Sequence, residues 1–165
     1  MTIAPQWIPL LKSDGAEVDR IAKLIHPTLP ERKEVLLEKI RLFPGGCFKF
    51  VFNGQMAGYG ISHPWALCSV PPLDDFLRAL PANPDCIYIH DVAVLPEARG
   101  HTAAGKFIEK ISAVAKRMHI KRLACVSVYG THVLWARFGF RITESCLDLA
   151  TYGDRAKYMI ADLSQ

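Results

Sequence analysis

The segment from His90 to Ile111, HDVAVLPEARGHTAAGKFIEKI, joins an extended apolar run to an amphipathic helix through small residues. The first four N–H groups of a helix have no partner inside the helix, and together they carry about half a positive charge. A phosphate or pyrophosphate binds such N–H groups when no bulky side chain blocks its approach. The residues at this junction keep the approach open: Gly100, Ala103, Ala104 and Gly105. The junction therefore indicates an anion-binding turn, although a plain tight strand-to-helix connection also uses small residues.

Polar side chains in the same segment fit an anionic ligand. Arg99 can pair with a phosphate or fix the loop, and the Thr102 hydroxyl can donate to a phosphate oxygen. Between Glu97 and Arg122 lie seven basic and two acidic residues. A solvated helix face explains most of these charges. Their positive field would also attract a phosphorylated ligand to this half of the chain.

Composition sets broad limits on the class of protein. A chain of 165 residues, half apolar, most simply forms a single domain over residues 1–165. The net charge of +4 is too small to indicate a nucleic-acid partner. The sequence contains no apolar run of 18 residues, so we expect no transmembrane helix and no membrane partner. The first fifteen residues lack the pattern of a signal peptide, so we expect a cytoplasmic protein. No C-x-x-C pair suggests a metal site or a disulfide framework, so we expect free thiols at Cys47, Cys68, Cys86, Cys125 and Cys146.

Hydrophobic periodicity and turn residues predict the elements that position this segment. We expect strands at Trp7–Leu11, on both sides of the Asn53-Gly54 turn, and at Cys86–Leu95, Leu123–Val128, Phe140–Leu149 and Lys157–Leu163. We expect helices from Ser13 or Asp14 to the stop at Pro27, near Glu31–Leu42, along the apolar stripe from Phe107 to Met118, and at Thr131–Phe138. This order predicts an α/β fold with helices on the faces of a mixed sheet. The proline-rich stretch Leu67–Pro84 reads as a substrate-facing loop with a short helix at Leu73–Leu80.

The pattern R-G-x-x-x-A-G, from Arg99 to Gly105, resembles the acyl-CoA loop of the GNAT N-acetyltransferase superfamily. The signature of that loop is Q/R-x-x-G-x-G/A, and its three defined places hold Arg99, Thr102 and Ala104. Thr102 stands where the family usually has glycine, and this departure puts in question whether the phosphate cradle keeps the strength and shape usual in the family. Four further segments resemble the family in its order: FNGQMAGYGIS its early hairpin, YIHDVAV its fourth strand, VLWARFGF a later helix, and YGDRAKYMIADL the closing strand of a bacterial subgroup.

The resemblance implies a mostly antiparallel central sheet that splays between strands four and five and is flanked by helices. It implies acetyl-CoA as co-substrate and no metal, with a primary amine of a small molecule or protein attacking the thioester directly. Homodimers are common in the family, so the resemblance makes a homodimer possible, and no feature of the sequence itself indicates one. Backbone groups of the fourth strand would bind the pantetheine arm, and the loop would hold the pyrophosphate. The implied coenzyme A contacts are Val92, Ala93, Val94, Arg99, Gly100, His101, Thr102, Ala103, Ala104 and Gly105.

Such a reaction needs a proton acceptor, because a primary amine of pKa near ~10 is protonated at neutral pH. His90 and Asp91 lie mid-strand beside the implied acyl site. Alternation puts their side chains on opposite faces, so only one is expected to face the cleft. An acidic residue near Asp91 is common in the family, which favours Asp91 as the base, with His90 second. Structural roles compete with both assignments: Asp91 could hold a loop, and His90 could be a core histidine.

A proton donor for the departing thiolate is less evident. The family's usual tyrosine position holds Trp135, whose indole is no proton donor to a thiolate. We expect Trp135 to pack against the pantetheine arm or in the core, and Arg137 to meet the 3′-phosphate side of CoA or to be solvated. Tyr129 is the candidate donor, with Tyr152 and Tyr158 as alternatives, and ordinary strand packing competes with all three.

Three functions stay open on the sequence alone. The first is acetyl transfer to an amine. The second is a non-catalytic acyl-CoA-binding or regulatory module, to which Thr102 and Trp135 point. The third is transfer of a longer acyl group. The acceptor has no recognisable motif, although Trp65 and Phe76 could line an apolar acceptor pocket.

Overall fold

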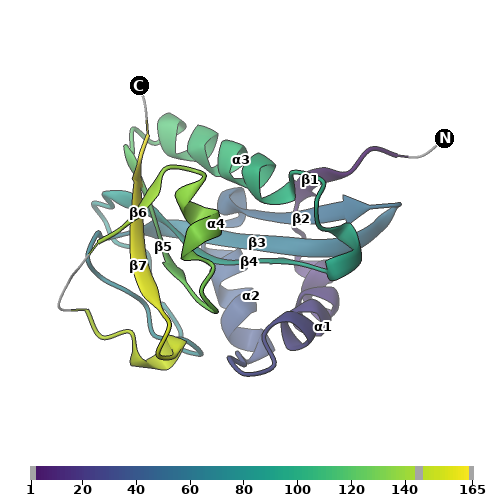
Figure 1. Ribbon diagram of the computed structural model, residues 1–165, viewed down its shortest axis with the longest axis horizontal. Coiled ribbons are helices and arrows are strands. Elements are labelled where there is room, and N and C mark those ends of the chain that lie inside the picture. The colour runs from purple at the N-terminus through teal and green to yellow at the C-terminus, as the bar shows by residue number, and fades with distance from the viewer. Residues whose placement is uncertain (1–2, 144–146, 164–165) are drawn as a thin grey trace.

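Seven strands form one mixed sheet, in a computed structural model that describes residues 3–143 and 147–163 (Figure 1). The strand order is β1-β2-β3-β4-β5-β7-β6, and every pairing is antiparallel except that of β4 with β5. The strands are β1 (Gln6–Pro9), β2 (Cys47–Phe52), β3 (Gln55–Trp65), β4 (Cys86–Val94), β5 (Arg122–Ser127), β6 (Phe140–Ile142) and β7 (Lys157–Asp162). The predicted fold class and order of elements are confirmed.

Helices cover both faces of the sheet. They are α1 (Gly15–Ile25), α2 (Lys33–Leu42), α3 (Ala103–Arg117) and the short α4 (His132–Ala136). Figure 1 shows α3 on one face and α1 and α2 on the other. The α3 stripe packs on the sheet through the fully buried Phe107 and Ile111, whereas Met118 lies beyond the helix end and is exposed. Among the described helices, none is long and apolar enough to cross a membrane.

Local turn chemistry fixes several boundaries where the sequence predicted them. Asn53 and Gly54 adopt φ angles of 52° and 76°, and they join β2 to β3 as a two-residue hairpin turn requires. Helix α1 ends at Ile25, directly before His26 and Pro27. Gly139 closes the segment after α4 with a φ of 86°.

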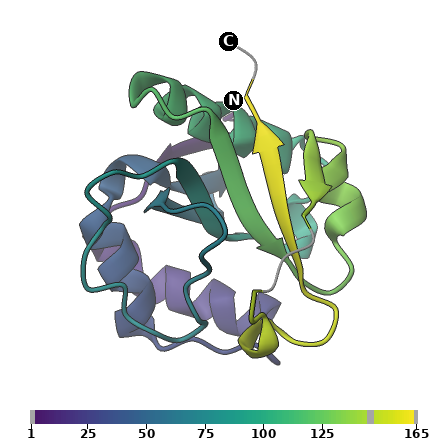
Figure 2. The same cartoon turned by 90° about the vertical axis from the view of Figure 1, so that its left-hand side faces the viewer.

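The stretch 66–85 contains no helix, so the short helix predicted at Leu73–Leu80 is wrong. Asp74 and Arg78 adopt left-handed φ angles of 57° and 69°, which interrupt a right-handed helix. The backbone N–H groups of Leu77 and Arg78 donate instead to the Glu38 carboxylate on α2, at 2.6 and 3.0 Å. Figure 2 shows this teal loop lying on the same side of the sheet as α1 and α2.

The strand predicted over Phe140–Leu149 is also shorter than expected. It pairs with β7 only through Phe140–Ile142. Residues 144–146, including Cys146, lie outside the described residues, and Leu147 and Leu149 pack against a separate apolar cluster around Tyr88 and Tyr158. Of the described cysteines, Cys47, Cys68, Cys86 and Cys125 are free thiols.

A β-bulge in β4 changes which side chains share a face. Ile61 of β3 lies opposite Asp91, and the next residue, Ser62, lies opposite Ile89, so His90 is an extra residue without a partner on β3. A bulge of this kind interrupts the alternation of side chains along a strand. The side chains of both His90 and Asp91 consequently contact residues between the end of α1 and the start of α2.

Strands β4 and β5 separate after a short parallel stretch. They pair only from Ile87–Leu123 to Ile89–Cys125, although β4 continues to Val94 and β5 to Ser127 (Figure 1). The second half of β4 therefore has a strand neighbour on the β3 side only. This confirms the predicted splay between strands four and five.

The edge strand β1 is tied to the start of α3. The Trp7 indole N–H donates to the Ala103 carbonyl at 2.8 Å. Its ring lies 5.1 Å from the Phe50 ring and 5.0 Å from the Phe107 ring, measured between centroids. The first turn of α3 is thus anchored by a buried side chain from 96 positions earlier in the sequence.

Candidate active site

A cavity of about 960 Å³ lies between the separated halves of β4 and β5. One end is bounded by the start of α3 and by α4. The other end is bounded by the α1–α2 connection, the 66–85 loop and the loop after β5. Splayed strands create this space because each leaves backbone and side chains uncovered on the side that faces the gap.

The end near α3 has the features of an anion site. Ala103, Ala104 and Gly105 form the first turn of α3, where N–H groups have no acceptor within the helix. Gly100 precedes them with a φ of 81° and no atom within 4 Å of the place where a Cβ would lie. Thr102 adopts a φ of 55°, unusual for a β-branched residue. Its hydroxyl donates to the His101 carbonyl at 2.6 Å and is thereby committed to the loop.

Arg99 fixes the loop, which is one of its two predicted roles. Its Nε donates to the Val94 carbonyl at 3.0 Å, which joins the loop to the last residue of β4. The side chain is exposed and lines the cavity. Arg137, at the end of α4, lines the same end, so both arginines of the cavity lie near the helix start.

The backbone of β4 offers polar groups to the gap. Leu95 donates its N–H to Ala57 on β3 at 2.8 Å. Because an antiparallel strand turns alternate residues toward the same neighbour, the backbone groups of Ala93 and Asp91 also face β3. Those of Val92 and Val94 face the gap. The Val94 carbonyl accepts from Arg99, and the N–H groups of Val92 and Val94 both point toward the cavity as donors.

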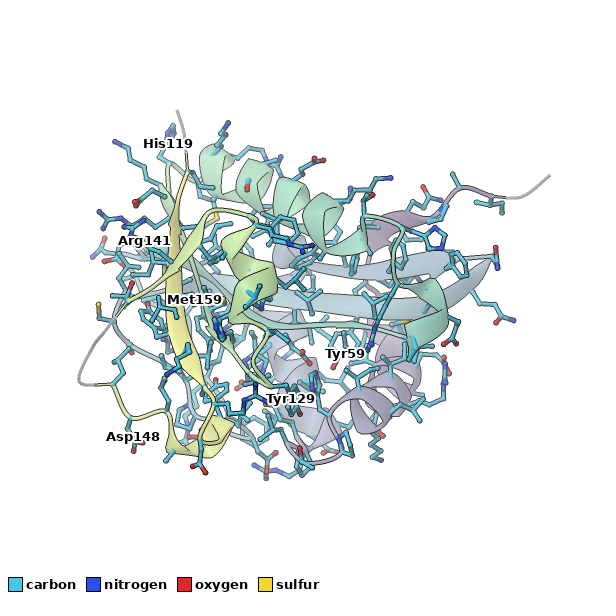
Figure 3. All side chains as sticks on the ribbon, in the orientation of Figure 1. Tyr59, His119, Tyr129, Arg141, Asp148 and Met159 are labelled. Atoms are coloured by element: carbon cyan, nitrogen blue, oxygen red, sulfur yellow. The ribbon has the colours of Figure 1, made fainter. Side chains whose placement is uncertain are left out.

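The opposite end contains a hydrogen-bonded chain built around Asp91. One carboxylate oxygen lies 2.8 Å from His26 Nε2, and the other accepts the Tyr59 hydroxyl at 2.5 Å. The Tyr129 hydroxyl lies 3.4 Å from His26 Nδ1, and the two rings stack with centroids 5.9 Å apart. Tyr129, from the loop after β5, lies on the side of the sheet that carries α1 and α2 (Figure 3).

The carboxylate sets both the tautomer and the basicity of His26. Burial alone would lower the pKa of His26, but the Asp91 carboxylate outweighs it, so the pKa is raised above 6.5. In its neutral form His26 donates Nε2–H to Asp91 and keeps the Nδ1 lone pair toward Tyr129. The two side chains are similarly exposed, at 16% for His26 and 12% for Asp91. Both Asp91 oxygens are engaged in short contacts, whereas His26 Nδ1 faces the Tyr129 hydroxyl at 3.4 Å, so His26 Nδ1 is the basic atom that is freer to accept a proton.

A second buried pair joins the bulge to the α1–α2 connection. His90 Nε2 lies 2.8 Å from Glu31, and the same carboxylate accepts the Asp74 N–H at 3.1 Å. Burial opposes ionisation of Glu31, but His90 and these hydrogen bonds lower its pKa to about 2. The His90 side chain is fully buried, and its Nδ1 has no partner among the described residues. This pair holds the α1–α2 connection against β4.

Most of the predicted site residues line one cavity. They are His90, Asp91, Tyr129, Val92, Val94, Arg99, Gly100, Thr102, Ala103, Ala104, Gly105, Trp135 and Arg137. Ala93 and His101 are the exceptions, because Ala93 packs in the core and the His101 ring lies 4.7 Å from Phe52. The expectation that alternation puts the side chains of His90 and Asp91 on opposite faces is wrong, since the bulge lets both contact the α1–α2 connection.

The other predicted aromatic residues divide between cavity and core. The Trp135 ring lines the cavity and packs edge-on against Phe140, with centroids 5.3 Å apart. Tyr152 also lines it, but its hydroxyl donates to the Pro71 carbonyl at 2.6 Å. Tyr158 accepts the Cys68 N–H and does not border the cavity, and neither do Trp65 and Phe76. Tyr129 is therefore the accessible phenol near His26.

Sequence reasoning missed His26, Glu31 and Tyr59. His26 lies 65 residues from Asp91, and no spacing rule relates two residues so far apart. The only local signal is that His26 and Glu31 are polar residues around the proline break after α1. Within the described ranges, no group of three or more His, Cys, Asp or Glu side chains is placed to hold a metal.

Comparisons with known proteins agree with this geometry. The family model for the Acetyltransferase (GNAT) family matches residues 17–140. Ard1 from Thermoplasma volcanium has a TM-score of 0.76 at 13% identity, covering 99% of this chain and 100% of that one. The NatC complex bound to Gag peptide and CoA gives 0.71 at 19%, covering 98% and 100%. The GphF GNAT-like decarboxylase in complex with isobutyryl-CoA gives 0.78 at 16%, covering 96% and 100%. No curated protein sequence matches significantly.

A splayed sheet with a helix start facing the gap is thus the fold of a GNAT acyltransferase-like protein. The chain belongs to the GNAT acetyltransferase family, whose matched region covers both the hairpin and the loop from Arg99 to Gly105.

Proposed function

We propose that this chain is an N-acetyltransferase that transfers an acetyl group from acetyl-CoA to a primary amine by direct attack. The observation that carries the proposal is one cavity that has the open helix start of α3 at one end and the His26–Asp91 pair at the other. A neighbour of the same fold, the NatC complex, binds a peptide and CoA.

The start of α3 and the gap have complementary parts in the proposed binding of acetyl-CoA. The N–H groups of Ala103 to Gly105 bind the pyrophosphate, with Arg99 and Arg137 as cationic neighbours. The pantetheine arm lies along β4, because the gap replaces a strand partner there. The Val92 N–H then donates to the thioester oxygen, where negative charge develops during attack.

His26 is the base in this proposal, and Asp91 is a positioning residue. An ammonium acceptor must lose one proton before it attacks, and His26 Nδ1 accepts it directly or through a water molecule. Asp91 holds Nε2–H and stabilises the imidazolium that results, while Tyr59 holds Asp91. We therefore assign the base role to His26 rather than to Asp91 or to the buried His90.

Proton balance gives Tyr129 a role. Attack forms the C–N bond and breaks the C–S bond, so the nitrogen loses a second proton and the CoA thiolate gains one. The Tyr129 hydroxyl is the donor closest to His26 that is also exposed, at 43% of the residue surface. It supplies the proton to sulfur and is reprotonated from the nitrogen side or by solvent.

Thiol release is the direct test. Purified protein is mixed with acetyl-CoA and a panel of primary amines, and free CoA is measured with a thiol reagent, with product mass confirmed. We expect amine-dependent release that His26→Gln reduces by about 10²-fold or more without loss of acetyl-CoA affinity in calorimetry. Absence of heat and thermal shift at millimolar acetyl-CoA would refute the proposal.

Two features support a non-catalytic acyl-CoA-binding module as the alternative. The Thr102 hydroxyl is committed to the loop, and Trp135 stands where the family usually has a tyrosine. Tight acetyl-CoA binding without turnover on any amine would favour that module. Turnover that depends on His26 would exclude it.

A further inference from the structure

The two ends of the cavity differ in charge. Its only arginine or lysine side chains among the described residues are Arg99 and Arg137, and both lie at the α3 end. At the far end the ionisable groups form closed pairs, since His26 is paired with Asp91 and His90 with Glu31. Apart from Thr131, whose hydroxyl donates to the Val128 carbonyl, the rest of the far-end lining is apolar or aromatic: Ile25, Leu29, Leu73, Val128, Tyr129 and Tyr152.

An acceptor that carries a carboxylate beside its amine would meet no lysine or arginine among the lining residues at this end, and the charge of a protonated His26 is already paired with Asp91. A carboxylate buried without a partner pays a large desolvation cost, and bidentate arginine pairs are the usual remedy in proteins. The Asp91 and Glu31 carboxylates would add repulsion. A protonated amine meets the opposite situation, because both carboxylates attract it while its apolar substituent contacts the leucines.

We propose that the acceptor is a primary amine with an apolar substituent and no carboxylate on the amine-bearing carbon. This inference rests on the proposed function and narrows its substrate class. Two sources share the chemistry: a small aralkyl or alkyl amine, and the amino terminus of a peptide whose first side chain is apolar. Free amino acids are excluded by the missing cation.

The Arg155 side chain is the strongest competing anchor for a carboxylate. Its guanidinium contacts Gly130 in the loop after β5, next to Tyr129. Arg155 does not border the cavity, so the inference assigns it no role in acceptor binding. Arg155→Ala therefore leaves the preference between amines and amino acids unchanged.

Matched acceptors test the inference. The set is 2-phenylethylamine, phenylalanine, phenylalaninamide and a tripeptide with amino-terminal phenylalanine, each assayed with acetyl-CoA for thiol release. We expect kcat/KM for 2-phenylethylamine or the tripeptide to exceed that for phenylalanine by at least about 10²-fold. We expect kcat/KM for phenylalaninamide to be close to that for 2-phenylethylamine, because phenylalaninamide differs from phenylalanine only in lacking the carboxylate charge. Whichever of 2-phenylethylamine and the tripeptide has the higher kcat/KM shows whether the acceptor is a small amine or the amino terminus of a peptide.

A gain of charge sharpens the test. Leu29→Lys places a cation in the apolar end and should raise the phenylalanine-to-phenylethylamine ratio of kcat/KM at least about 10-fold. Leu24→Lys is the control, since Leu24 is 59% exposed on α1 and does not border the cavity. Equal or faster turnover of phenylalanine by the unaltered protein would overturn the inference, as would loss of that turnover in Arg155→Ala.

Failure of the proposed function gives a different result. If no acceptor releases thiol, calorimetry with the CoA-saturated protein still compares 2-phenylethylamine with phenylalanine. Binding of the amine alone supports the assigned pocket chemistry, and binding of phenylalanine alone contradicts it. Turnover restricted to carboxylate-bearing amines would keep the acetyltransferase and reject this acceptor class.

Discussion

His26 is charged at lower pH and basic at higher pH, and its neighbours decide where the change occurs. Asp91 and Glu31 favour the charged form, burial opposes it, and Tyr129 lies against Nδ1. We expect kcat/KM to rise with pH as His26 loses its proton, with a midpoint above 6.5. Asp91→Asn removes the main charge that holds the proton, so the midpoint should move to lower pH while the maximal rate falls. A pH–rate profile unaltered by Asp91→Asn would contradict this coupling.

The lowered pKa of Glu31 predicts how the free energy of unfolding depends on pH. Its pKa is about 2 in the folded chain and near 4.5 in an unfolded one, so it stabilises the fold above pH 4.5. That contribution, on the order of 1–3 kcal/mol, disappears as the pH falls from 4.5 toward 2. Urea unfolding should show Glu31→Gln destabilised at pH 7 and nearly equal to the unaltered protein at pH 2. An equal difference at both pH values would exclude the linkage.

Single residues were predictable from sequence only where the chemistry is local. The seven consecutive residues from Arg99 to Gly105 indicate a helix start, because most of those that follow Arg99 are small. Asp91 could be singled out from the sequence as a carboxylate in a strand. Its contacts with His26 and Tyr59, which engage both of its oxygens, could not be predicted. Those contacts depend on the register of β3 against β4 and on where α1 ends. Neither is encoded by any pattern around Asp91.

At the scale of elements, the loop from Arg99 to Thr102 should control coenzyme A affinity. Gly100→Glu places a carboxylate where the helix start attracts an anion, so we expect Kd for acetyl-CoA to rise about 10-fold or more. Gly139→Glu is the control, because Gly139 has a similar φ of 86°, equally open surroundings, and no place in the cavity lining. Calorimetry of both variants separates charge from backbone strain. Equal weakening in both variants would mean that strain alone acts.

Packing of α3 on the sheet depends on Gly60 in β3. A Cβ at this position would overlap the ring of the fully buried Phe107. Gly60→Ala should therefore lower the free energy of unfolding by about 1–3 kcal/mol, measured in urea. Gly45→Ala serves as the comparison, since a Cβ there meets no atom within 4 Å. A neutral Gly60→Ala would show that α3 shifts away without cost.

The elements themselves were largely predictable, and their exceptions have physical causes. Apolar spacing located α1, α2 and α3, and Asn53-Gly54 located the hairpin. The 66–85 loop misled because its apolar spacing suits a helix, while its N–H groups are claimed by Glu38. The bulge at His90 depends on two strands paired together, so alternation along β4 alone predicted the wrong faces.

For the whole molecule, ligand binding should appear as stability. Acetyl-CoA bridges α3, β4 and α4 in the proposed complex, elements that meet little else across the gap. A ligand at 100 times its Kd adds about 2.7 kcal/mol to the free energy of unfolding. For a chain of this size the midpoint of thermal unfolding should rise by roughly 5–10 °C. High salt should shrink the increase, because the phosphates meet partly exposed cations. An increase independent of salt would argue against the arginine contacts.

The bond from Trp7 to the Ala103 carbonyl spans 96 positions of sequence. The first turn of α3, where we propose that the diphosphate binds, is thus held by a side chain from the edge strand β1, far away in sequence. Trp7 is one of three tryptophans in the chain, and because its indole packs against both Phe50 and Phe107, it is the one whose fluorescence depends on the docking of β1. Deletion of β1 should therefore weaken the binding of acetyl-CoA, although no residue of β1 lines the cavity.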